Sequence, residues 1–266
     1  MNSPPTFLLA GLLSLSPFCC GLSVAQNDAN KKPNRVLRIL PLGETPPFVF
    51  KQEGGARVEA DAPAGSIPPR QIVQVTKNGE ERGNPLPLRL GQISAPTPAT
   101  GGTVSLHAVG SSGPEPKAWH ALRMPGNATH ALALLWRDPD EKKWTKAHSL
   151  SLADDLKAFP PGMVRFVNVS TGPATIEFSG ETIELEPGNV ALRGTARAAI
   201  EGESLQVKVS DAKGKAVRVH AASLSHTAEE RTNVIIYKAD GKRPRRPAKV
   251  FARPERAKLA TPPRGR

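Results

Sequence analysis

Short apolar runs separated by turn residues are the main feature of this chain, and they recur roughly every 8 to 15 positions. Stretches with the 3.6-residue periodicity of an amphipathic helix are few. The pattern predicts an all-β protein of two consecutive antiparallel β-sandwich domains, immunoglobulin-like and with little helix, because fifteen short strands exceed what one sandwich holds. The expected strands are residues 35–42, 71–76, 86–92, 103–109, 119–124, 130–137, 144–150, 163–169, 175–178, 182–185, 190–192, 204–209, 216–223, 233–238 and 248–252.

Proline and glycine mark the places where this pattern is interrupted. Pro160 and Pro161 end a segment with room for one helical turn at residues 152–158, so we place a domain boundary there. Residues 51–66 and 94–102 are expected to be surface excursions. The expected division is a signal peptide at 1–25, a polar linker at 26–34, a first sandwich at 35–150, a linker with a short helix at 151–162, a second sandwich at 163–252 and a disordered basic tail at 253–266.

The first 25 residues have the features of a cleavable export signal. Residues 7–24 carry no charge and are rich in leucine, and the leader ends at Ala25 in the small-x-small pattern that signal peptidase prefers. A retained membrane anchor is the less favoured alternative, because Pro17 and Gly21 interrupt an apolar run that is already short for a bilayer. The sequence predicts an exported protein, periplasmic or extracellular and associated with the cell envelope, without a transmembrane span once the leader is removed.

Both cysteines, Cys19 and Cys20, lie inside this leader. A chain without thiols after export cannot be held by disulfides and needs an ordinary apolar core. The same absence argues against cysteine nucleophiles, iron–sulfur clusters, cysteine-based zinc sites and blue-copper sites. We therefore expect no redox or cysteine-ligated metal chemistry.

Positive charge is concentrated at the carboxyl end of the chain. Residues 238–266 carry eleven Lys or Arg against two acids, and thus most of the formal net charge of +12. Flexible cations of this kind bind anionic polymers or lipid surfaces, whereas nucleic acid is disfavoured because Phe251 is the only aromatic residue after Tyr237. The candidate polyanion-binding residues are Lys242, Arg243, Arg245, Arg246, Lys249, Arg253, Arg256, Lys258, Arg264 and Arg266.

Several local patterns are specific enough to predict. Residues 130–137 are apolar on both faces of the expected strand, so this strand should be central in its sheet. Pro139 and its flanking aspartates predict a hairpin directly after this strand. Gly214 predicts a second hairpin, because the turn there needs a residue that adopts a positive φ. The stretches that begin at Leu37 and Val164 resemble each other weakly, as two related domains would.

Catalytic and metal-binding patterns are not apparent in this sequence. The histidines lack the i, i+2 or i, i+4 spacing of metal ligands, and the serines lack the G-x-S-x-G pattern of hydrolases. Adjacent carboxylates, such as Asp154 with Asp155 and Glu229 with Glu230, are expected at a solvated surface. Trp119, Trp136 and Trp144 fit a sandwich core better than a sugar-stacking platform. We therefore expect neither catalytic residues, nor a cofactor, nor a metal site.

One stretch carries a resemblance to a known group. Phe166, Asn168 and Ser170 form F-x-N-x-S, and the hairpin after it closes with Leu185-x-Pro187-Gly188. The chain here resembles uncharacterised exported bacterial β-sandwich proteins, a group without an assigned activity. The resemblance implies the fold and export but no active site.

The sequence as a whole favours a non-catalytic, exported envelope protein with a cationic tail that contacts an anionic envelope polymer or lipid. Two alternatives stay open. One is a periplasmic assembly or chaperone-like module that binds a protein partner through an exposed sheet edge. The other is a hydrolase whose site is assembled from residues distant in the sequence.

Overall fold

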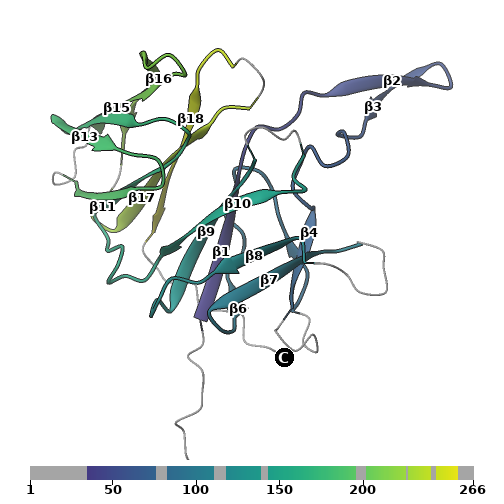
Figure 1. Ribbon diagram of the computed structural model, residues 1–266, viewed down its shortest axis with the longest axis horizontal. Coiled ribbons are helices and arrows are strands. Elements are labelled where there is room, and N and C mark those ends of the chain that lie inside the picture. The colour runs from purple at the N-terminus through teal and green to yellow at the C-terminus, as the bar shows by residue number, and fades with distance from the viewer. Residues whose placement is uncertain are drawn as a thin grey trace, which may run out of the picture. The chain divides into compact units, whose positions relative to one another are not determined.

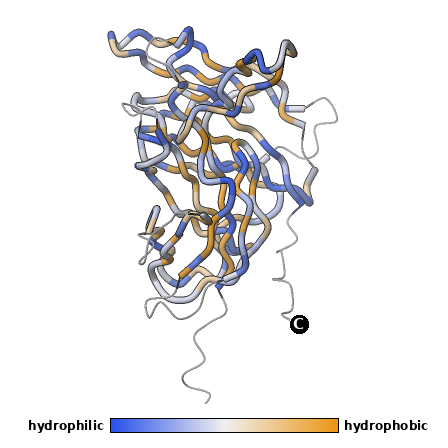
Figure 2. The backbone as a smooth tube through the Cα atoms, turned by 90° about the vertical axis from the view of Figure 1, so that its right-hand side faces the viewer, coloured by the Kyte–Doolittle hydropathy of each residue, from blue (hydrophilic) through white to orange (hydrophobic). Residues whose placement is uncertain are grey.

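The computed structural model describes residues 35–75, 83–110, 118–138, 143–195, 202–225, 227–240 and 244–256. Within these ranges the chain forms eighteen strands and no helix, which confirms the all-β prediction (Figure 1). Figure 2 shows hydrophobic residues recurring along the strands, while hydrophilic residues are frequent in the turns. The expected leader, the polar linker and residues 257–266 lie outside the described residues.

The first sandwich consists of two four-stranded sheets. One sheet has the order β10-β9-β1-β6, and the other has the order β5-β4-β7-β8. A separate two-stranded hairpin, β2-β3, belongs to neither sheet. The strands are β1 (Arg35–Leu42), β2 (Val49–Glu53), β3 (Ala56–Ala60), β4 (Gln71–Val75), β5 (Leu86–Pro87), β6 (Thr97–Ala99), β7 (Thr103–Ala108), β8 (His120–Arg123), β9 (His130–Arg137) and β10 (Ala147–Ala153).

The second sandwich has the same plan. Its sheets have the orders β14-β11-β17-β18 and β13-β12-β15-β16. The strands are β11 (Met163–Val169), β12 (Ala174–Phe178), β13 (Glu181–Leu185), β14 (Val190–Gly194), β15 (Glu203–Ser210), β16 (Ala216–Leu224), β17 (Glu230–Lys238) and β18 (Ala248–Arg256).

The two sandwiches are topological copies of each other. If β2 and β3 are set aside, the remaining eight strands of the first sandwich correspond in chain order and in sheet position to the eight strands of the second. Strand β1 matches β11, and β9 matches β17, so the weak echo between the stretches at Leu37 and Val164 has a structural counterpart. The hairpin β2-β3 is then an insertion into the first copy, between the equivalents of β11 and β12.

Two strand pairs are parallel, whereas the sequence predicted antiparallel sheets only. Strand β1 pairs in parallel with β9, and β11 pairs in parallel with β17, while every other pair is antiparallel. In each copy the first strand lies beside the penultimate strand. Because a long stretch of chain separates the two, a tight turn does not force them to run in opposite directions.

Three apolar clusters hold the sheets together. One lies inside the first sandwich and one inside the second. The third joins the β1-β9 pair to the β11-β17 pair, with Leu40, Leu134 and Ile235 among its fully buried members. Strand β9 is therefore covered on both faces, and the prediction that residues 130–137 form a central strand is confirmed.

The structure differs from the expected strands in several places. The excursion at 51–66 overlaps the hairpin β2-β3, which begins at Val49, and the loop at 94–102 contains β6, which pairs with β1. Strand β10 continues to Ala153, where it still pairs with β9, so the single helical turn expected at 152–158 begins later, where Phe159 N donates to Asp155 O (2.8 Å).

The carboxyl end also differs from the expectation. The basic tail was expected to begin at Arg253, but β18 pairs with β17 through to Arg256. Pro254 is accommodated because β18 is an edge strand of its sheet, where an amide N–H is not required on the open side.

Candidate functional site

A buried cluster of ionic side chains lies where the two sandwiches meet. Asp154 follows β10 and is only 1% exposed. Its carboxylate accepts hydrogen bonds from Arg38 on β1, from Arg165 Nη2 (2.9 Å) and from Arg231 Nη2 (3.1 Å). Glu255 of β18 accepts from Arg38 Nη1 at 2.6 Å. The expectation that Asp154 is a solvated surface carboxylate was therefore wrong, because arginines from three other strands, β1, β11 and β17, converge on it.

Burial and charge act in opposite directions in this cluster. Burial alone raises the pKa of Asp154, but the charges of the three arginines outweigh it and hold that pKa below its ordinary value. Burial lowers the pKa of Arg165 to about 10. These groups are therefore ionised at neutral pH, and an Asp154 carboxylate held this way is a poor proton donor or base. The cluster bridges strands of both sandwiches through these ion pairs.

Asp155 has a different role from its neighbour. Its Oδ1 accepts from the Thr129 hydroxyl and from the backbone N–H groups of Thr129 and His130, both at 3.0 Å. Burial raises the pKa of Asp155, but these hydrogen bonds outweigh it and lower the pKa. The side chain therefore fixes the start of β9, and the adjacent carboxylates do not act as a pair.

One serine and one histidine approach each other in the first sandwich. His120 Nε2 on β8 lies 2.9 Å from Ser149 Oγ on β10. Burial, together with the charge of His148, lowers the pKa of His120, so its imidazole is neutral at pH 7. Within the described residues, no hydrogen bond or ion pair joins His120 to a carboxylate that would orient it as a general base. The contact ties two sheet edges together and does not form a triad.

The candidate polyanion-binding residues fall into three groups. Lys242, Arg243, Lys258, Arg264 and Arg266 lie outside the described residues. Lys249, Arg253 and Arg256 are exposed on β18, where Lys249 Nζ forms an ion pair with Glu44. Arg245 and Arg246 lie in the loop that precedes β18 and are also exposed.

Arg246 connects this loop to an edge of the opposite sheet. Its Nη1 donates to Val219 O of β16 at 2.9 Å. Burial, followed by the charge of Arg246, lowers the pKa of the neighbouring His220. Arg218 and Lys215 come from the same end of β16 and are exposed. We call Lys215, Arg218, Arg245 and Arg246 the basic edge.

The side chains of the basic edge have no ion-pair partner among the described residues, although the Asp211 carboxylate accepts from the backbone N–H of Lys215 (3.0 Å). The nearby Lys208 is different, since its Nζ bonds Glu177 Oε1 at 2.6 Å. The sequence pointed to Arg245 and Arg246 through the charge run, but it missed Lys215 and Arg218, because only the fold brings β16 beside β18.

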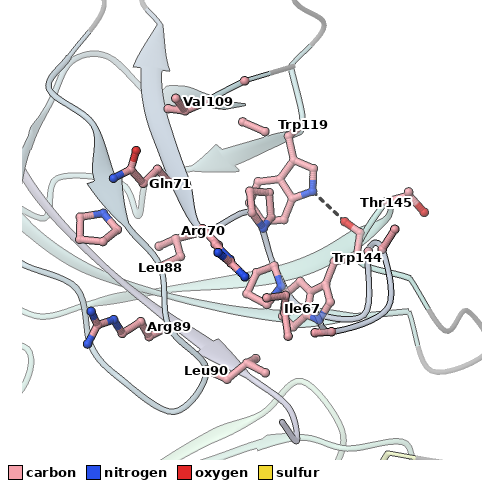
Figure 3. A pocket seen from close by; sticks show the side chains of 18 of the residues that line it. Ile67, Arg70, Gln71, Leu88, Arg89, Leu90, Val109, Trp119, Trp144 and Thr145 are labelled. Atoms are coloured by element: carbon pink, nitrogen blue, oxygen red, sulfur yellow. Dashed lines mark hydrogen bonds between the residues drawn. The ribbon is translucent and has the colours of Figure 1, made fainter. Parts of the chain in front are cut away.

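A groove with a volume of about 1050 Å³ lies in the first sandwich. One wall is the proline-rich segment after β3, which includes Pro63, Ile67 and Pro68. Trp119 and Trp144 also line the groove, and Ile67 lies beside Trp144 (Figure 3). The groove is mainly apolar, and its size suits a peptide segment or a ligand of drug-like dimensions.

Two backbone hydrogen bonds of Trp144 hold the residues that line the groove in place. Its backbone N–H donates to Gly65 O (2.7 Å), and its carbonyl accepts from Trp119 Nε1 (2.7 Å; Figure 3). Trp144 itself is buried in the core, as expected for a sandwich tryptophan, and the Trp119 ring packs 6.5 Å from it. The segment after β3 is thereby attached to the body of the sandwich.

The F-x-N-x-S and L-x-P-G residues are structural. Asn168 is fully buried, and its Nδ2 donates to Gly172 O (2.9 Å) and to Leu185 O (2.8 Å). Its Oδ1 accepts from Ser170 N (3.0 Å) and Ser170 Oγ (2.6 Å). Gly188 N donates back to Asn168 O (2.7 Å). The motif therefore fastens the turn between β13 and β14 to the end of β11.

The comparisons with known proteins give no match to this chain: no family model matches it, and neither does any curated protein. Among the described residues, no helix is long and apolar enough to span a membrane. The same residues include no group of three or more His, Cys, Asp or Glu side chains placed to hold a metal ion.

Proposed function

We propose that the protein is a non-catalytic, exported protein of the cell envelope that contacts anionic polymer or lipid through the basic edge of its second sandwich. The observation that carries the proposal is the convergence of exposed cations from two separate segments, the loop before β18 and the start of β16, whose side chains form no ion pair with a described residue. The apolar leader supports export.

The chemistry of the basic edge suits phosphate or carboxylate groups that are spaced along a surface. Arg218 and Arg245 offer planar guanidinium groups, which bind such anions with two parallel hydrogen bonds. Because they are exposed, they lose little hydration energy before they meet a ligand. Cations near an anionic surface contribute about 1 kcal/mol each, so four of them give binding that is reversible and sensitive to salt.

The proposal is tested with the double variant Arg218→Gln/Arg245→Gln. We expect binding to anionic vesicles or to an immobilised acidic polysaccharide to weaken roughly 30-fold at about 0.05 M salt, since about 2 kcal/mol is lost. Retention by the unaltered protein should also fall steeply when salt is raised to about 0.3 M. Comparing vesicles with polysaccharide distinguishes a lipid from a polymer target.

Arg123→Gln/Lys157→Gln is the matched control, because both residues are exposed, lie outside the basic edge and change the net charge equally. Equal weakening by the two double variants would leave only a net-charge effect and no specific edge. Binding that is indifferent to salt would also contradict the proposal.

A further inference from the structure

The inserted hairpin β2-β3 exposes large apolar side chains on both of its faces. Phe48 is 72% exposed and Phe50 is 50% exposed, and Val49 and Val58 are also exposed. In Figure 1 the hairpin projects away from the labelled sheets of the first sandwich. Soluble proteins rarely leave such a cluster uncovered unless it forms an interface.

The two strands of the hairpin pair with each other but do not belong to a larger sheet. Gly54 and Gly55 both have positive φ, as the two central residues of a type I′ turn require, so the strands are tightly registered. Within the described residues, neither β2 nor β3 pairs with a third strand, and the guanidinium of Arg57 lies over the Phe50 ring, 4.5 Å from its centroid. A two-stranded ribbon is marginal in water and gains stability by packing against another surface.

The groove and the hairpin are built from the same insertion. The chain leaves β3 at Ala60 and immediately forms the groove wall at Ala62 and Pro63. The second sandwich has only residues 170–173 at the equivalent position, so it has neither feature. The segment that follows β3 is thus both the base of the hairpin and an edge of the groove. If a twofold axis relates two copies of the chain near this segment, each hairpin lies in the groove of the other copy.

One unpaired charge on each surface can complement the other. Among the described residues that line the groove, the charged ones are Arg70 and Arg89, and Arg70 already has a partner in Asp61 (3.7 Å). Glu59 on β3 is exposed and forms no ion pair within the described residues. Arg89 is likewise exposed and without such a partner, so Glu59 of one copy can meet Arg89 of the other.

We infer that two copies of this chain form a closed dimer by exchanging the β2-β3 hairpins into each other's groove. The symmetry is isologous, so the assembly ends at two copies. A fully exposed aromatic side chain offers on the order of 150–250 Å², so the four phenylalanines supply several hundred Å² of the roughly 1,200–2,000 Å² that a stable interface buries. The inference does not depend on the basic edge.

The test is the association state of the purified full chain, measured by sedimentation or by light scattering after gel filtration. The unaltered protein is expected to be a dimer. Phe48→Ser/Phe50→Ser should weaken the dimer by at least roughly 100-fold, because each change occurs twice in a symmetric interface. Val190→Ser, which alters a residue that is 42% exposed on β14, is the matched control and should leave the dimer intact.

A charge exchange identifies the groove as the docking site. Arg89→Glu alone and Glu59→Arg alone should each weaken the dimer, and the combination of both should restore it. A monomeric unaltered protein would overturn the inference, as would a dimer that survives the phenylalanine changes. If the combined variant does not restore the dimer, the hairpin of one copy does not dock in the groove of the other. The monomeric variant should keep its salt-sensitive binding to anionic surfaces, so the two proposals can fail separately.

Discussion

At the scale of single residues, Asp154 forms more ion pairs than its local sequence indicates. Three arginines surround it, and two of them also stack on Phe159, with Arg165 4.1 Å and Arg231 5.0 Å from the ring centroid. The cluster holds three arginines against two carboxylates, Asp154 and Glu255. Removing Asp154 would leave three buried or half-buried cations against one carboxylate.

We expect Asp154→Asn to lower the free energy of unfolding by about 3–5 kcal/mol at pH 7, as does breaking a buried ion pair by removing one partner. Since the folded-state pKa of Asp154 is lowered, its contribution is full above the unfolded pKa of about 3.9 and is lost as the pH falls through the folded value. Denaturant titrations should therefore show the difference from the unaltered protein shrinking below about pH 4.

Glu186→Gln is the control for this prediction, because Glu186 is an exposed carboxylate in the turn after β13. It should change stability by less than about 0.5 kcal/mol. A comparably small loss in Asp154→Asn at pH 7 would mean that the cluster does not stabilise the fold.

At the scale of elements, strand character could be predicted but strand partners could not. The buried and exposed positions of β15 alternate with a period of two, a signal that is present in the local sequence. The apolar faces of residues 130–137 likewise predicted a central strand. The parallel partner of that strand is about ninety residues earlier in the chain, and no local pattern specifies such a pairing.

The candidate site was less predictable for the same reason. The ionic cluster assembles Arg38, Asp154, Arg231 and Glu255 from elements far apart in the chain, and each looks locally like an ordinary surface charge. The sequence predicted two of the four residues of the basic edge, Arg245 and Arg246, because they belong to a run of positive charge. Lys215 and Arg218 do not belong to such a run and were not predicted. Segments rich in proline and glycine were assigned to loops, although β2, β3 and β6 lie within them.

Asn168 provides the test at this scale. Asn168→Ala removes four side-chain hydrogen bonds, including those to Leu185 O and from Ser170 N, while Gly172 O and the Ser170 hydroxyl keep their mutual bond (3.1 Å). We therefore expect a loss of about 2–4 kcal/mol. Asn168→Asp should be worse at neutral pH, because a buried carboxylate would face the carbonyls of Gly172 and Leu185. Urea denaturation measures both.

The order of these two variants is the discriminating result. The aspartate variant should regain stability at acidic pH, where its carboxyl becomes protonated and can donate to one of the carbonyls. If the aspartate were as stable as the unaltered protein at pH 7, the carbonyls would not be aimed at this side chain as described.

At the scale of the whole molecule, a duplicated plan carries two different surfaces. The first copy has the hairpin insertion and the groove, and the second has the basic edge. The third apolar cluster and the Arg38–Glu255 contact join the inner sheets of the two copies. Each inner sheet therefore has an apolar outer face that only the other sandwich covers, and neither copy is a self-sufficient unit.

This coupling predicts that the two sandwiches unfold together. All three tryptophans belong to the first sandwich, and Trp136 also packs against the joining cluster, so their fluorescence reports on the first sandwich and the junction, whereas far-ultraviolet circular dichroism reports on both sandwiches. The two probes should give coincident urea transitions.

Leu134→Ala removes a buried side chain from the joining cluster, which costs about 2–5 kcal/mol, and it should separate the transitions. Leu122→Ala, in the core of the first sandwich only, costs a similar amount but should keep them coincident, because the joining cluster is intact. Separate transitions in the unaltered protein would mean that each sandwich is stable alone, and the joining cluster would then be a docking contact instead of a shared core.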